Sequence, residues 1–113
     1  MKMILAFIPP YRLDDVRRGL ERLPHFPGMT VTDGRGFGRE KMEPGGAGQR
    51  RPLVEYTGTA RIEVVTDDEQ VESILRAITE VAHTGRPGDG KIFVLPVERA
   101  IRVRSLEEGE AAV

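Results

Sequence analysis

The sequence contains no cysteine and only two histidines, His25 and His83. Without cysteine, neither disulfides nor thiolate metal sites are available, and two histidines are too few for a histidine metal cluster. No stretch of about 18 apolar residues and no signal peptide is visible, so we expect a cytoplasmic protein that is not embedded in a membrane. The formal net charge of −1 argues against a general affinity for nucleic acid.

The chain has 113 residues, of which 39% are hydrophobic, and this suits one domain over residues 1–113. Residues 1–8 form a nearly continuous apolar run that is typical of a buried strand, and prolines follow it directly. A helix is then predicted, with Asp14 and Asp15 in its first turn and apolar residues at helical spacing: Leu13, Val16, Leu20 and Leu23. Residues 29–33 alternate in a way that predicts a second strand.

A second unit of the same kind follows a long loop. Residues 60–64 alternate between apolar and charged side chains, which predicts a half-exposed strand. Thr66 and Asp67 are candidate helix caps, and a helical apolar face follows at Val71, Ile74, Leu75, Ile78 and Val81. Residues 91–95 complete the unit as a strand. We expect a further short strand at 101–103 and a mobile tail over about 105–113.

Two βαβ units in tandem predict an α+β fold, a ferredoxin-like βαββαβ sandwich in which two helices cover one face of a four-stranded antiparallel sheet. The other face of such a sheet still carries apolar side chains and needs a partner. Packing three sheets around an axis would supply one.

The segment Thr84-Gly85-Arg86-Pro87-Gly88-Asp89-Gly90-Lys91 is a glycine-rich loop that opens directly into an apolar strand. Its glycines leave backbone N–H groups unshielded, and such groups can converge on an anion. Lys91 adds a charge, and Arg102 and Arg104 are spaced to share one face of an extended segment. These features suggest a polyphosphate site, whereas the alternative is that the glycines merely make a tight turn. A P-loop is excluded, because a strand rather than a helix follows and Ile92 stands where a P-loop has a hydroxyl.

These residues, with Val97-Glu98 and Arg102-Val103-Arg104, resemble the C-terminal signature of the PII signal-transduction family. Residues 13–17, 28–32 and 36–39 resemble the same family upstream, so the similarity covers nearly the whole chain. The resemblance implies a compact homotrimer that binds ATP and ADP as effector ligands in the clefts between subunits. By similarity, the nucleotide-binding residues are Thr30, Gly36, Gly38, Arg39, Glu63, Gly88, Asp89, Gly90, Lys91, Arg102 and Arg104. For residues 36–39 alone, a strand end with a bulge is an equal alternative.

Residues 40–57 show no periodicity, and a loop of this length in a compact domain is usually functional or disordered. By position they match the PII T-loop, the arm that contacts target proteins. Pro52 stands where the family has a modifiable tyrosine, so regulation by uridylylation is not expected. Glu40 replaces a glutamine and Thr59 a lysine, two residues that help typical members to hold magnesium and 2-oxoglutarate. Glu40 is nevertheless a possible Mg²⁺ ligand beside the nucleotide.

Three functions remain open from the sequence. The first is a PII-like regulator, not an enzyme, that controls a target such as a membrane transporter or a metabolic enzyme through its T-loop. The second is a slow nucleotide hydrolase with Glu40 as base, which no nucleophile–base pair supports. The third is a trimeric metal-tolerance protein of the CutA type, against which the lack of cysteine and the clustered arginines argue.

Overall fold

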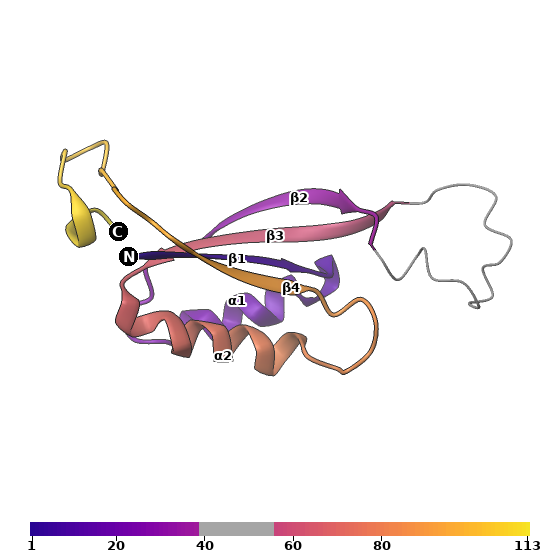
Figure 1. Ribbon diagram of the computed structural model, residues 1–113. Coiled ribbons are helices and arrows are strands. Elements are labelled where there is room, and N and C mark those ends of the chain that lie inside the picture. Colours follow the sequence, from indigo (N-terminus) through magenta and orange to yellow (C-terminus); the bar gives the residue numbers. More distant parts are fainter. Residues whose placement is uncertain (39–55) are drawn as a thin grey trace, which may run out of the picture.

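The computed structural model describes residues 1–38 and 56–113, which form a four-stranded antiparallel sheet with two helices packed on one face (Figure 1). The order of strands across the sheet is β2-β3-β1-β4. The ferredoxin-like α+β fold predicted from the sequence is therefore confirmed. Its strands and helices are β1 (Lys2–Ile8), α1 (Leu13–Glu21), β2 (Thr30–Gly36), β3 (Thr57–Thr66), α2 (Val71–Ala82) and β4 (Lys91–Pro96).

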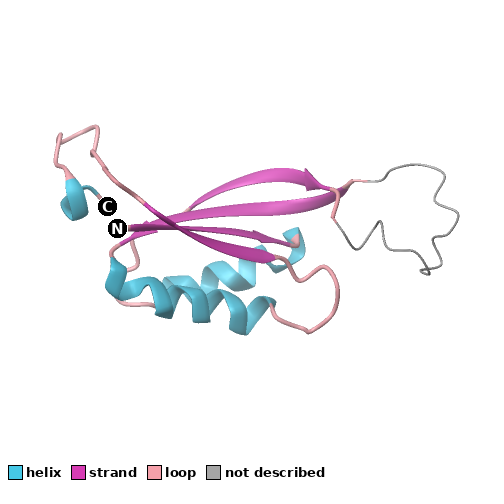
Figure 2. Cartoon of the chain, in the orientation of Figure 1, coloured by secondary structure: helices cyan, strands magenta, loops and turns pink. Residues whose placement is uncertain are grey.

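Short 3-10 helices complete the secondary structure (Figure 2). The first, Pro10–Arg12, leads from β1 into α1, and proline suits its first position because no backbone N–H is needed there. The second, Asp68–Gln70, leads into α2. The Asp67 side chain accepts a hydrogen bond from the Gln70 N–H at 3.0 Å, so this predicted cap is confirmed.

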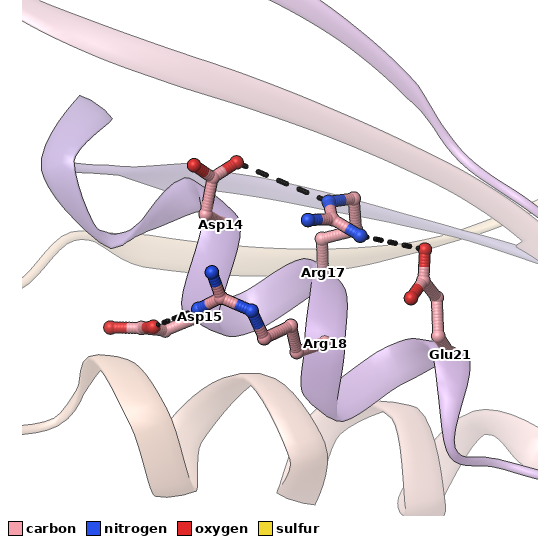
Figure 3. Close-up of polar contacts among 5 residues, drawn as sticks. All are labelled: Asp14, Asp15, Arg17, Arg18 and Glu21. Atoms are coloured by element: carbon pink, nitrogen blue, oxygen red, sulfur yellow. Dashed lines mark hydrogen bonds and ion pairs between the residues drawn. The ribbon is translucent and has the colours of Figure 1, made fainter.

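Helix α1 carries its charges on the exposed side in pairs one turn apart (Figure 3). The Arg18 guanidinium lies 2.7 Å from the Asp15 carboxylate, and the Arg17 guanidinium lies 2.9 Å from that of Glu21 and 4.0 Å from that of Asp14. Exposed pairs of this kind contribute at most about 1 kcal/mol each, so they support the helix without determining the fold.

The hydrophobic core lies between the helices and one face of the sheet. Alternate residues of β1 and β3 point into it, while Val16 and Leu20 of α1 and Ile74 and Ile78 of α2 close it from the other side. Gly19 of α1 faces α2, where a Cβ would make only an ordinary contact, 3.6 Å from the Ala77 carbonyl oxygen. The strand residues of the core are Ile4, Ala6, Ile8, Ala60, Ile62 and Val64.

The opposite face of the sheet carries no helix in the described part of the chain (Figure 1). Its apolar side chains remain partly exposed, and Phe93 and Leu95 of β4 keep 49% and 37% of their surface accessible. Phe7 and Phe93 contact each other edge to face, with ring centroids 6.4 Å apart. This uncovered face is the one that the sequence indicated would need a partner.

Several boundaries differ from the sequence predictions. Strand β2 continues past residue 33 to Gly36 and β3 begins before residue 60 at Thr57, because these two ends pair with each other as a long hairpin. At its other end β3 continues to Thr66, paired with β1. The strand predicted at 101–103 is wrong, since the structure has only a single bridge between Ile101 and Glu108 in that region. The tail folds back instead, ending in a 3-10 helix at Gly109–Ala112. No helix among residues 1–38 and 56–113 is long and apolar enough to cross a membrane.

Candidate functional site

The glycine-rich loop runs from the end of α2 to the start of β4. Gly85, Gly88 and Gly90 all have positive φ values, of 84°, 96° and 114°. Side chains other than hydrogen are strained in this region, so the backbone path requires glycine at these positions. The loop is therefore a tight turn, which was the alternative given for these glycines.

Asp89 holds the first part of this loop in place. Its Oδ2 accepts hydrogen bonds from the N–H groups of Thr84 and Gly85, at 2.6 and 2.9 Å, and its Oδ1 accepts one from the Thr84 hydroxyl at 2.6 Å. The hydrogen bonds from Thr84 are the main cause that lowers the pKa of Asp89 to about 2, so the carboxylate is ionised at neutral pH. The Thr84 hydroxyl in turn accepts a bond from the Arg86 N–H at 3.1 Å.

Gly90 fixes the other end of the loop against β1. A Cβ built on Gly90 would overlap the carbonyl oxygen of Phe7 and lie 3.2 Å from the Cα of Ile8. The backbone of the loop thus passes so close to the end of β1 that only glycine fits. From the sequence this glycine was assigned either to ligand binding or to a tight turn, and the packing against β1 could not be predicted.

The N–H groups of the loop divide into two sets. Those of Thr84, Gly85 and Arg86 are used within the loop by Asp89 and the Thr84 hydroxyl. Those of Gly88, Asp89 and Gly90 make no hydrogen bond to the residues that the structure describes. A run of such donors in a turn with positive φ is the arrangement that receives anions in proteins.

Lys91 begins β4, and its directly opposite partner on β1 is Phe7. Phe7 is in turn opposite Arg61 of β3, which is opposite Thr32 of β2, so these four residues form one row on the uncovered face. The Arg61 guanidinium lies 5.8 Å from the centre of the Phe7 ring and its Nε lies 3.4 Å from the Glu63 carboxylate. Arg61 was not among the predicted site residues, although its alternation with Ile62 in the strand pattern places it on this face.

Thr30 and Glu63 are directly opposite each other on β2 and β3, so the structure brings these two predicted residues together. Gly36 ends β2 opposite Thr57, and Gly38 follows it. The predicted residues Arg39 and Glu40, like Pro52, lie outside the described part of the chain. At the base of that segment the rings of Phe37 and Tyr56 lie 6.2 Å apart.

Arg102 and Arg104 do not join the other predicted residues. They follow β4 at its far end, close to the N-terminus, whereas the glycine-rich loop precedes β4 at the opposite end of the sheet (Figure 1). With a rise of roughly 3.3 Å per residue, β4 alone separates the two groups by about 17 Å. Arg102 is engaged within the tail, where its N–H donates to the Glu107 carbonyl oxygen at 2.9 Å and its guanidinium to the Val113 backbone oxygen at 3.4 Å.

A shallow hollow of about 280 Å³ lies between the end of α2, the loop and β1. Its apolar lining includes Ile78, Ala82 and Ile92, and its polar lining includes His83 and Asp89. In residues 1–38 and 56–113 no group of three or more His, Cys, Asp or Glu side chains could hold a metal ion. The groups that the described residues gather around the loop are backbone N–H donors, the Lys91 ammonium and the engaged carboxylate of Asp89.

The comparisons with known proteins identify the family. A family model described as Nitrogen regulatory protein P-II matches residues 1–107. Relatives of that name from Pasteurella multocida (strain Pm70) and Azospirillum brasilense are 47% and 43% identical over 113 residues, and each alignment covers all of both chains. Nitrogen regulatory protein P-II 1 of Escherichia coli (strain K12) is 42% identical over the same length.

A solved structure agrees with this assignment. Arabidopsis thaliana PII bound to citrate is similar with a TM-score of 0.80 and 38% sequence identity, covering 99% of this chain and 91% of that one. The matches do not favour a CutA-type protein. The chain belongs to the nitrogen regulatory protein P-II family.

Proposed function

We propose that this chain is a regulatory protein that binds ATP and ADP competitively in the clefts between the subunits of a homotrimer. The state of the nucleotide site is passed to a target protein through the T-loop, residues 40–57. Membership of the P-II family supports the regulatory class, and the loop with its unused N–H groups supports the anion site. The target is a membrane transporter or a metabolic enzyme in the cytoplasm, and nucleic acid is not a partner.

The separation of the two cationic groups is the observation that carries the proposal. Lys91 and the glycine-rich loop lie at one end of the sheet, and Arg102 and Arg104 lie beyond the other end (Figure 1). One polyphosphate cannot reach both groups in a single chain. A second copy, packed against the uncovered sheet face, would bring its arginines to the loop of the first. Because the loop–arginine contact is head to tail, a closed ring of copies satisfies every site, and three copies form such a ring.

The roles of the residues follow from this arrangement. The N–H groups of Gly88, Asp89 and Gly90, with the Lys91 ammonium, receive the phosphates from one chain, and Arg102 and Arg104 of the next chain complete their neutralisation. Gly36, Gly38 and Arg39 line the same nucleotide, while Thr30 and Glu63 serve its ribose or purine. Glu40 is suited to a Mg²⁺ ion on the phosphates, since a carboxylate is a hard oxygen ligand.

Binding rather than turnover is the proposed task. The described residues of the site include cations and N–H donors. The Thr84 hydroxyl is bonded to the Asp89 carboxylate, but a carboxylate whose pKa is lowered to about 2 by its bonds from Thr84 is too weak a base to activate a nucleophile. Steady-state measurement of phosphate release from ATP should therefore show no more than a trace rate. A turnover in the range of ordinary enzymes would contradict the regulatory assignment.

Calorimetry tests the proposed site. We expect one ATP per chain, displaced by ADP, and light scattering should give about three times the chain mass of 12.6 kDa. A charge-assisted contact to phosphate is worth roughly 1.5–3 kcal/mol, so Lys91→Ala and Arg102→Ala should each weaken ATP by about ten- to a hundredfold. Arg18→Ala is the matched control, because Arg18 pairs with Asp15 on the exposed side of α1. Unchanged ATP affinity in both site variants, or a monomer, would refute the proposal.

A further inference from the structure

We infer that Asp89 is a positioning residue whose side chain fixes the glycine-rich loop from behind, while only its backbone N–H faces the nucleotide phosphates. This inference rests on the proposed function and makes it more specific. Resemblance to the family placed Asp89 among the nucleotide-binding residues without saying which of its atoms act. The structure separates the two parts of the residue.

Both oxygens of the carboxylate are already engaged within the loop. Its two oxygens accept bonds from the N–H groups of Thr84 and Gly85 and from the Thr84 hydroxyl. The imidazole of His83 approaches from the end of α2, with Nδ1 lying 3.8 Å from Oδ2. All of these partners belong to the segment that enters the loop, so the side chain points back toward the end of α2.

Electrostatics favours the same assignment. The carboxylate is ionised at neutral pH, because its bonds from Thr84 and Gly85 hold its pKa near 2. An ionised carboxylate aimed at a polyphosphate would repel it, since like charges at contact distance disfavour each other. Donors that surround the carboxylate on the α2 side offset this charge while leaving the N–H of residue 89 free for an anion.

The loop is consequently fixed at two points and open between them. Asp89 ties it to the end of α2, and the close passage of Gly90 over the Phe7 carbonyl ties it to β1. A Cβ at Gly88 would have no atom within 4 Å, so the middle of the loop faces open space. A binding loop held in this way has its N–H donors in place before the ligand arrives. The apparent affinity is proportional to the fraction of time that the donors spend in the binding arrangement, so a loosened loop binds more weakly.

Four variants test the inference. Asp89→Asn keeps the shape and the backbone N–H but has one acceptor oxygen instead of two, so it cannot hold both Thr84 N–H and hydroxyl as before. Thr84→Val removes the hydroxyl, and Thr84→Ser retains it. Glu72→Gln, in the first turn of α2, is the control for loss of one negative charge at a site remote from the loop.

We expect Asp89→Asn and Thr84→Val each to weaken ATP and ADP by about tenfold, with the double variant close to the single ones because both disrupt one unit. Adenosine, which lacks phosphates, should bind all variants alike, and Thr84→Ser should bind ATP as the wild type does. Tighter ATP binding by Asp89→Asn would overturn the inference, since removing a charge that faces the phosphates would have that effect. Fully additive losses would also contradict it.

Hydrogen exchange of the nucleotide-free protein separates this inference from the proposed function. The N–H groups of Thr84 and Gly85 should exchange at least several-fold faster in Asp89→Asn than in the wild type or Glu72→Gln, because they lose an ionised acceptor. That result supports the loop anchor even if the wild type fails to bind ATP, an outcome that would refute the proposed function alone. Equal exchange rates in all three proteins would refute the role of Asp89.

Discussion

Mixed assemblies of two defective chains should recover the tight nucleotide binding that neither chain shows by itself. One chain carries Lys91→Ala and keeps its arginines, and the other carries Arg102→Ala and keeps its loop. In the proposed ring, each cleft takes the loop of one copy and the arginines of the next. A cleft with an intact loop from the second variant and intact arginines from the first therefore has every contact of the wild type.

The size of the recovery follows from the ring. When equal amounts of the two chains assemble at random, about three quarters of the trimers contain both, and each mixed trimer has one intact cleft among its three. About a quarter of all clefts should thus bind ATP with wild-type affinity. The remaining clefts lack one or both contacts and bind at least about tenfold more weakly.

Co-refolding the two chains and titrating them by calorimetry measures this fraction. The tight phase should have about a quarter of the wild-type stoichiometry, and each variant refolded alone should show none. Wild type mixed equally with a chain that carries both substitutions provides the converse control. If each site takes its loop and its arginines from two neighbouring chains, both chains are wild type in about a quarter of the clefts. If each site lay within one chain, about half of the sites would be intact. Absence of a tight phase in the first mixture would refute the two-chain site.

Two further predictions concern the second ligand and the loop. Glu40 is negative where typical family members have glutamine, and Thr59, whose hydroxyl donates to the Ile8 carbonyl at 3.2 Å, stands where they have a lysine. Millimolar 2-oxoglutarate should therefore not tighten ATP binding in the presence of magnesium. A gain of about tenfold in ATP affinity, measured by calorimetry, would contradict this expectation. Gly90→Ala should lower the free energy of unfolding by about 2–5 kcal/mol, because the alanine would have a positive φ and its Cβ would overlap β1. Gly88→Ala should lower it by only about 1–2 kcal/mol, because the Cβ would enter open space and only the positive φ would be unfavourable. Denaturant titration measures both variants, and equal losses would show that the overlap is relieved.

The order and type of the elements could be predicted from the sequence because their patterns are local. The helical spacing of Val16 and Leu20 gives α1 its buried side, and the alternation around Ile62 gives β3 its two faces. The ends of β2 and β3 could not be predicted in this way. Residues 34–36 and 57–59 have little apolar periodicity, and they are strands because each pairs with the other. The bridge between Ile101 and Glu108 could not be predicted either, because it forms only when the chain turns back between these two residues.

For the site, the sequence indicated the residue types but only part of their distribution in space. Gly88, Gly90 and Lys91 could be selected because glycine and lysine in one loop suit an anion, and Thr30 and Glu63 do lie opposite each other. The separation of Lys91 from Arg102 follows from the extended β4 between them, so the strand predicted at 91–95 already implied it, whereas the folding back of the tail that engages Arg102 could not be predicted. The two roles of Asp89 depend on hydrogen bonds that only the folded loop makes.

The passage of Gly90 over the end of β1 connects the packing of the core with the affinity of the site. The position of the Phe7 carbonyl is set by β1, and β1 is held by Ile4, Ala6 and Ile8, which are buried between the sheet and the helices. A substitution that shifts this strand by a fraction of an ångström therefore moves the donors of the loop by a similar amount. Selection of random variants for altered ATP affinity should accordingly return changes under the helices, at positions that touch no ligand. In this protein, stability and affinity would then evolve together rather than as separate traits.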